Sequence, residues 1–140
     1  MINPNIPLDA INNFSKNTLL EQLDIRVTKL GEDFIEGTMP VDKRTHQPAG
    51  LLHGGASAAL IESLGSIGST LLVDMATHSI VGLEINANHV RGVKSGTVTG
   101  RAKIVHAGRK THLWQVDITN EEGKLVCTGR LTVIVVEKKN

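Results

Sequence analysis

The chain has 140 residues, which is the size of one domain, and its 15 Lys and Arg residues against 14 Asp and Glu leave a formal net charge of +1. This balance, with no basic run longer than Lys138-Lys139, disfavours nucleic acid or an anionic membrane as a partner. The single cysteine, Cys127, excludes an internal disulfide, favours a buried thiol over a nucleophile and fits a reducing cytoplasm.

The N-terminal segment predicts a helical lead-in, residues 1–23, followed by a β hairpin. Residues 1–9 lack the basic and apolar regions of a signal peptide, so we expect no export. Apolar residues then recur at roughly helical spacing up to Leu23, which predicts one or two short amphipathic helices. Alternating patterns over 24–30 and 33–41, joined by a tight connection, predict the hairpin.

A long helix is predicted over residues 54–73, after a loop that carries Pro48 and Gly50. This helix is apolar nearly all round, so it must be buried nearly all round. It is also apolar enough to raise the question of a membrane span. One Glu, four glycines and four serines within 54–73 argue against that interpretation.

Four extended segments follow, over 79–92, 96–106, 111–119 and 124–136, at the spacing of an antiparallel meander. In the first, alternation predicts a core face that ends in two polar residues: Val81, Leu83, Ile85, Ala87, His89 and Arg91. The opposite face is predicted to contact solvent or another subunit: Gly82, Glu84, Asn86 and Asn88. The whole order predicts an α+β domain over 1–140, in which a curved antiparallel sheet wraps around one central helix.

Glu62 is the most informative residue, because it is the only Asp, Glu, Lys or Arg between Arg44 and Asp74. Burying an unpaired carboxylate costs several kcal/mol, which suggests a functional purpose. Gly54 and Gly55 begin the same helix, where free N–H groups and the helix dipole can hold an oxyanion and where a substrate carbonyl can approach closely. Glu62 follows two turns later, and we expect it to share a helix face with Gly54.

Three further residues surround this pair, and each has a structural alternative. Ser66, one turn beyond Glu62, can donate a hydrogen bond to the carboxylate or to a water, or serve only as a small packing residue. Gln47 and His53 precede the helix and can orient an acyl group, or form an ordinary loop with a cap at its end.

The motifs Met39-Pro40-Val41-Asp42, 47–55, Glu62-Ser63 and 82–89 resemble those of the hotdog-fold acyl-CoA thioesterases, of the 4-hydroxybenzoyl-CoA thioesterase type with a helix-borne Glu. The resemblance covers residues 20–136 and is most specific over 39–66. It implies a hotdog fold and hydrolysis of an aromatic or medium-chain acyl-CoA, such as 1,4-dihydroxy-2-naphthoyl-CoA, or of an aroyl carrier-protein thioester. It also implies a homodimer as the minimal unit, with sites at the interface, and commonly a homotetramer.

The resemblance further implies roles for the site residues. Glu62 would be the nucleophile or the general base, and the Gly54 amide would polarise the thioester carbonyl. Gln47 would contact the thioester, His53 would hold the loop and the acyl group, and Ser66 would position a water.

Residues further along the chain would bind the rest of the substrate. Gly82, His89 and Arg91 would line the acyl or pantetheine path. Arg109 and Lys110 would meet the coenzyme A phosphates, unless they are solvated turn charges. The sequence has no phosphate-binding loop, dinucleotide fingerprint or zinc-type His spacing, so no cofactor and no metal are expected.

Two other functions remain open from the sequence: a hotdog module that binds acyl-CoA without turnover, and a hotdog hydratase. A hydratase would need a His and Asp pair, whereas this helix offers Glu and Ser. We expect four residues to line the acyl pocket, which would suit aromatic and medium aliphatic chains equally: Leu51, Leu52, Ile61 and Leu64. The small side chain of Ala49 hints at extra room.

Overall fold

One long helix packed against a six-stranded sheet forms the body of the molecule. The computed structural model describes residues 1–139, and the elements in chain order are α1 (Leu8–Asn13), α2 (Leu19–Gln22), β1 (Arg26–Leu30), β2 (Phe34–Val41), α3 (Gly54–Thr70), β3 (His78–His89), β4 (Gly96–Ala107), β5 (Thr111–Thr119) and β6 (Leu125–Glu137). In the described part of the chain, no helix is both long and apolar enough to cross a membrane.

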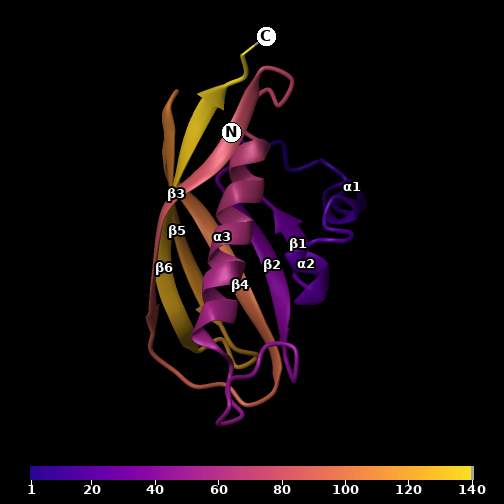
Figure 1. The fold of residues 1–140 in the computed structure, drawn as a ribbon, viewed down its shortest axis with the longest axis vertical. Helices are drawn as coiled ribbons and strands as arrows, with labels where there is room; N and C mark the ends of the chain where they lie inside the picture. Colours follow the sequence, from indigo (N-terminus) through magenta and orange to yellow (C-terminus); the bar gives the residue numbers. More distant parts are fainter. Residues whose placement is uncertain (140) are drawn as a thin grey trace.

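The sheet is antiparallel, with the strand order β1-β2-β4-β5-β6-β3. It curves around α3, which runs along one of its faces (Figure 1). Leu60, Ile61 and Leu64 of the helix are fully buried against the sheet, as expected for a helix that is apolar nearly all round. The predicted α+β architecture is therefore confirmed.

Glycines allow the helix and the sheet to approach closely. A Cβ added to Gly68 would lie 2.5 Å from the ring of Trp114, which is fully buried on β5, and one added to Gly100 of β4 would lie 2.8 Å from Leu64. Neighbours in a close-packed core cannot yield that much space without strain. Glycines on both the helix and the sheet therefore set the helix-to-sheet distance.

The N-terminal helices pack over β1, which is the edge strand opposite β3 in the sheet (Figure 1). The side chain of Asn12 fixes α1 there, because its amide donates to the Val27 carbonyl over 2.9 Å and accepts from the Val27 amide over 2.8 Å. The predicted lead-in is thus a docked part of the domain.

The meander prediction is wrong for its first strand. β4, β5 and β6 form a meander, but β3 pairs with β6 and does not pair with β4. Residues 90–95 therefore connect two strands that are not neighbours in the sheet. Turn residues mark where a strand ends, but they do not specify which strand the next one pairs with. The central helix also ends at Thr70, earlier than the predicted residue 73.

The predicted faces of β3 are also wrong in the first half of the strand. Gly82 pairs with Val133 and Glu84 pairs with Thr132, so Leu83 is the extra residue of a β-bulge. A bulge reverses the alternation of side chains along a strand. Val81 and Leu83 are consequently 52% and 59% exposed, while Gly82 faces the helix.

Candidate active site

The N-terminus of α3 leaves one of its first amides without a partner. His53 is the N-cap: its Nδ1 accepts from the Gly55 amide over 2.7 Å, and its carbonyl accepts from the amides of Ala56 and Ser57. The Gly54 amide has no acceptor among residues 1–139. It is therefore the donor available to a ligand, at the positive end of the helix dipole.

The cap also fixes the tautomer of the neutral His53 ring. Nδ1 accepts a hydrogen bond, so in the neutral ring the proton is on Nε2. The side chain is exposed. The ring thus presents an Nε2–H donor at the surface at the start of α3.

A cavity of about 410 Å³ lies beside this terminus. Its walls join the loop before α3, the start of α3 and the end of β3, through Gln47, Leu51, Leu52, Gly54, Ser57, His89, Val90, Arg91, Gly92 and Val126. The structure thus brings together four of the predicted site residues: Gln47, Gly54, His89 and Arg91.

Contacts within this cavity explain two of the residue choices. A Cβ on Gly54 would lie 2.7 Å from Nε2 of His89, so a larger residue would displace that ring. The side-chain oxygen of Gln47 accepts from the Ala49 amide, which leaves the Gln47 NH₂ group free to donate into the cavity.

Glu62 lies further along α3, against a different part of β3. It is half-buried, and a Cβ on Gly82 would collide with its Oε1. Within the described chain the Glu62 carboxylate forms no hydrogen bond or ion pair, and Ser66, half-buried one turn later, does not bond to it. The bulge at Leu83 is what turns Gly82 toward this carboxylate.

Gly54 and Glu62 both face β3, but they do not form one compact site within a single chain. Eight residues of α-helix correspond to a rise of ~12 Å. Their contacts on β3, His89 and Gly82, are also well separated along that strand. A chain therefore presents two separate features along β3, a carboxylate and an oxyanion donor.

The family model described as the thioesterase superfamily matches residues 49–127. The 1,4-dihydroxy-2-naphthoyl-CoA hydrolase of Escherichia coli is 47% identical over 131 residues, which cover 94% of this chain and 96% of that protein. The proofreading thioesterase EntH of Cronobacter turicensis is 49% identical over 129 residues, covering 92% and 93%. The chain belongs to the thioesterase superfamily.

Solved thioesterases have the same fold. A mutant thioesterase from Pseudomonas aeruginosa superposes with a TM-score of 0.95 at 45% identity, covering 98% of this chain and 99% of that one. A thioesterase from Haemophilus influenzae gives 0.92 at 46% identity, covering 97% and 94%. The predicted hotdog fold and thioester hydrolase activity are confirmed, in preference to a module without turnover or a hydratase.

Two residues of this thioesterase that were predicted to bind coenzyme A lie far from the cavity. Arg109 and Lys110 are exposed in the turn before β5. The start of β5 lies at the C-terminal end of α3, because His112 is hydrogen-bonded to Ser69. Within one chain they are thus at the opposite end of the helix from Gly54.

Of the four residues predicted to line an acyl pocket, two line the cavity and two do not. Leu51 and Leu52 line the cavity, whereas Ile61 and Leu64 are fully buried in the core of the thioesterase. Sequence reasoning missed Ser57, Val90, Gly92 and Val126 as lining residues. Ser57 follows Gly54 by one helical turn, so helical spacing could have revealed it.

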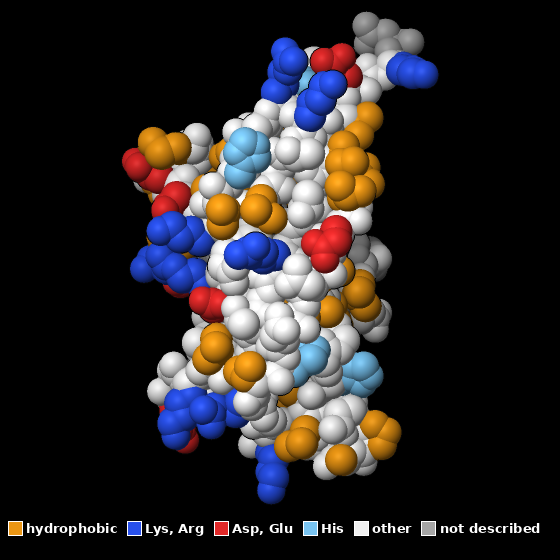
Figure 2. All heavy atoms as spheres, turned by 90° about the vertical axis from the view of Figure 1, so that its left-hand side faces the viewer, with side chains coloured by type: hydrophobic (Ala, Val, Ile, Leu, Met, Phe, Trp, Pro, Cys, Tyr) orange, Lys and Arg blue, Asp and Glu red, His pale blue; other side chains and the backbone are white. Residues whose placement is uncertain are grey.

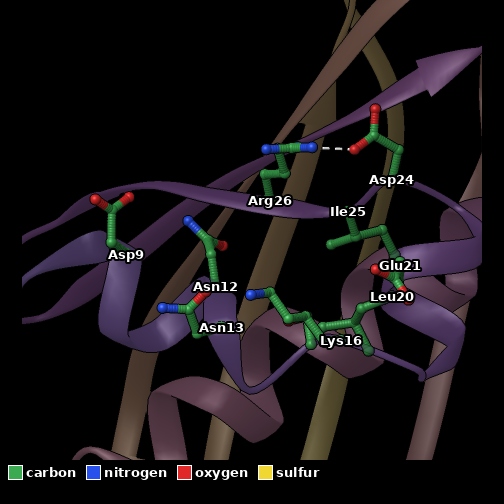
Figure 3. A pocket seen from close by; sticks show the side chains of 10 residues that line it. Asp9, Asn12, Asn13, Lys16, Leu20, Glu21, Asp24, Ile25 and Arg26 are labelled. Carbon is green, nitrogen blue, oxygen red and sulfur yellow. Dashed lines mark hydrogen bonds and ion pairs between the residues drawn. The ribbon is translucent and has the colours of Figure 1, made fainter.

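Two other hollows in the thioesterase lie away from the Gly54 cavity. The first, of about 340 Å³, lies between the N-terminal helices and β1 (Figure 3). Its Arg26 is paired with Asp24 over 2.7 Å, and its Asn12 is bound to the β1 backbone. The second, of about 580 Å³, is an apolar groove between α1 and the end of α3.

Cys127 does not contribute chemistry either. It is fully buried on β6, and burial raises the pKa of its thiol. A raised pKa disfavours the nucleophilic thiolate. Nor do residues 1–139 contain any group of three or more His, Cys, Asp or Glu that could hold a metal ion.

Proposed function

We propose that this thioesterase hydrolyses aromatic or medium-chain acyl-CoA, with the Gly54 amide as the oxyanion donor and Glu62 as the attacking or water-activating carboxylate. The observation that carries the proposal is the free Gly54 amide, which opens into a cavity with apolar walls at a helix N-terminus. Such a donor stabilises the negative charge that develops on a carbonyl oxygen under attack.

Two routes are compatible with these residues. The Glu62 carboxylate can attack the carbonyl carbon and expel the coenzyme A thiolate, which leaves an acyl anhydride that water hydrolyses. Alternatively, Glu62 takes a proton from a water whose oxygen attacks, and the tetrahedral intermediate then expels the thiolate. Both routes end in a carboxylic acid and coenzyme A, and both need the Gly54 amide at the carbonyl oxygen.

We propose further that the site is shared between two copies of the chain. A rise of ~12 Å along α3 separates the two features, which is too far for both to act on one carbonyl. The edge of β3 opposite β6 has no neighbour in the described sheet, and an unpaired edge strand of this length is a template for another chain. Pairing there can bring Glu62 of one copy to Gly54 of the other.

The contacts on β3 also predict the register of this pairing. Glu62 contacts the strand at Gly82, and Gly54 contacts it at His89. For Gly82 of one copy to meet His89 of the next, the strands must run antiparallel about a two-fold axis near Ile85 and Asn86. A two-fold axis is the usual symmetry of a homodimer, and it creates two identical sites.

The exposed apolar residues of β3 support the same interface. Val81 and Leu83 are more than half exposed. On the face of the molecule that includes β3, hydrophobic side chains occur in small groups separated by polar and charged ones (Figure 2). An interface of this kind combines backbone pairing with local apolar contacts. A further pairing of dimers would give the expected tetramer.

The cavity walls and the relatives suggest the acyl group. Leu51, Leu52, Val90 and Val126 provide an apolar wall, and the volume of about 410 Å³ suits an aromatic ring system or a medium aliphatic chain. The Escherichia coli relative is named for 1,4-dihydroxy-2-naphthoyl-CoA. A hydrolysis panel of bicyclic aroyl, monocyclic aroyl and aliphatic acyl-CoAs should show the highest kcat/KM for an aroyl-CoA.

Glu62→Gln tests the chemistry. We expect this variant to fold and to bind acyl-CoA, but to hydrolyse it at least ~10³-fold more slowly, because the amide can neither attack nor accept a proton. Glu122→Gln, which removes a carboxylate from an exposed turn, is the matched control and should keep the wild-type rate. Hydrolysis at the wild-type rate by Glu62→Gln would refute the proposed role.

A further inference from the structure

The loop of residues 42–53 carries Gln47 and His53 from the end of β2 to the start of α3. Loops are usually the mobile parts of a fold, yet a displacement of ~1 Å at a reacting group can cost ~10²-fold in rate. This loop therefore needs an internal anchor. Thr45 is only 2% exposed, whereas Lys43 and Arg44 beside it are exposed.

Thr45 binds both ends of this loop. Its hydroxyl donates to the Pro40 carbonyl over 2.7 Å and accepts from the Asp42 amide over 3.2 Å, at the end of β2. Its carbonyl accepts from the His53 amide over 2.8 Å, directly before α3. One buried side chain and one backbone carbonyl thus connect β2 to the first residue of the helix cap.

The bond to His53 reaches the oxyanion donor through a single residue. The Gly54 N–H belongs to the peptide that follows His53, and His53 itself caps the helix through its ring and its carbonyl. When the His53 amide is held by Thr45, rotation about the His53 backbone is restricted, and so is the direction of the Gly54 N–H.

Other contacts hold the outer part of the loop to a different segment. Nε2 of His46 bonds to the Lys94 carbonyl over 2.8 Å, and the Leu52 amide donates to the Val93 carbonyl over 2.8 Å. These bonds fix the loop to the residues after β3. Thr45 adds the link to β2 and so to the rigid body of the sheet.

We propose that Thr45 is a positioning residue of the thioesterase: its buried hydroxyl and its carbonyl orient His53 and thereby the Gly54 amide. This inference rests on the proposed role of that amide. The hydroxyl bonds to the Pro40 carbonyl and to the Asp42 amide, both of half-buried residues, so its removal takes a partner from each and loosens the turn. Binding of the acyl group depends mainly on the cavity walls, so removal of the hydroxyl should lower kcat more than it changes KM.

The test compares Thr45→Val, which keeps the shape but lacks the hydroxyl, with Thr45→Ser, which keeps the hydroxyl. Thr45→Val should lower kcat at least ~tenfold with KM changed less than ~threefold, whereas Thr45→Ser should recover most of the rate. Ser69→Ala is the matched control, because it removes a buried hydroxyl at the other end of α3. It should lower Tm without lowering kcat.

Equal losses in Thr45→Val and Thr45→Ser, or a wild-type kcat in Thr45→Val, would overturn the proposal. If Thr45→Val does not fold, hydrogen exchange of the wild-type protein decides: the His53 amide should exchange as slowly as amides inside β2, and fast exchange would overturn the proposal. A wild-type protein that hydrolyses no acyl-CoA would instead refute the proposed function, which separates the two failures.

Discussion

At the scale of single residues, Gly54 allows the most selective test because its backbone N–H can be removed. Proline has no N–H and is well tolerated at the first position of a helix, and His53 has the extended backbone that a residue before proline needs. Gly54→Pro should lower kcat ~10²–10³-fold, since it deletes one oxyanion donor.

Gly54→Ala is the control for the steric part of that change. Both substitutions add a Cβ that meets the flexible ring of His89, but alanine keeps the N–H. Steady-state kinetics should show a much smaller loss for Gly54→Ala. Equal losses for the two variants would mean that crowding of His89, and not the donor, limits the reaction.

Gly82 tests the placement of the carboxylate. A Cβ there would collide with Oε1 of Glu62, so Gly82→Ala should displace the carboxylate and lower kcat/KM by about 10²-fold. The control is the same substitution made in the Glu62→Gln variant, where it should cause no further loss because the carboxylate is already gone. If Gly82→Ala lowers activity as much in that variant as in the wild type, the contact between Gly82 and Glu62 has no special role.

The residue scale also shows what sequence could predict. Glu62 stood out because it is the one carboxylate in a long apolar run, and Gly54 because a helix N-terminus needs an acceptor or a ligand. Thr45 gave no such signal. Its importance depends on which backbone groups it meets after folding, and neither composition nor spacing encodes that.

At the scale of elements, the strands and the long helix were predictable from the periodicity of apolar residues and from turn residues. The bulge in β3 was not. One extra residue, Leu83, reverses the faces of half a strand, and no sequence pattern marks it. The sequence also could not predict which strand β3 pairs with. Its partner β6 comes last in the chain, so the pairing depends on closing a long loop.

The C-terminal end of α3 is fixed to β5 by a buried polar cluster. Ser69 accepts from Nε1 of Trp114 over 2.9 Å and bonds to Nδ1 of His112 over 3.0 Å. Burial lowers the pKa of His112, against the opposing effect of its bond to Gly108 and with a smaller contribution from His106. The folded protein therefore keeps this ring neutral at a pH where the unfolded chain binds a proton.

This difference predicts how stability depends on pH. Above a pH of about 6.5 neither state binds the proton at this position, and below it the unfolded state does so first. The free energy of unfolding should fall with decreasing pH, by up to ~1.4 kcal/mol per pH unit while only the unfolded state is protonated. Denaturant titrations at several pH values should show a weaker fall in His112→Gln. An identical pH dependence in both proteins would contradict this account.

At the scale of the whole molecule, the unpaired edge of β3 predicts a dimer. Leu83→Glu places a charge on an exposed position of that edge, so it should leave the chain folded but separate the subunits, and activity should disappear with the dimer. Val105→Glu, at an exposed position of β4, should change neither property. Sedimentation measurements and assays on the same samples provide the test. A monomeric Leu83→Glu with full activity would argue against an interface site.

The shared site itself is tested most directly by mixing two inactive variants. Glu62→Gln keeps the oxyanion donor, and Gly54→Pro keeps the carboxylate. After subunit exchange in equal amounts, half of the randomly paired dimers are mixed, and each mixed dimer contains one intact site made from the wild-type halves. The account predicts recovery of about one quarter of the wild-type rate. A mixture that hydrolyses acyl-CoA no faster than its two separate components would contradict it.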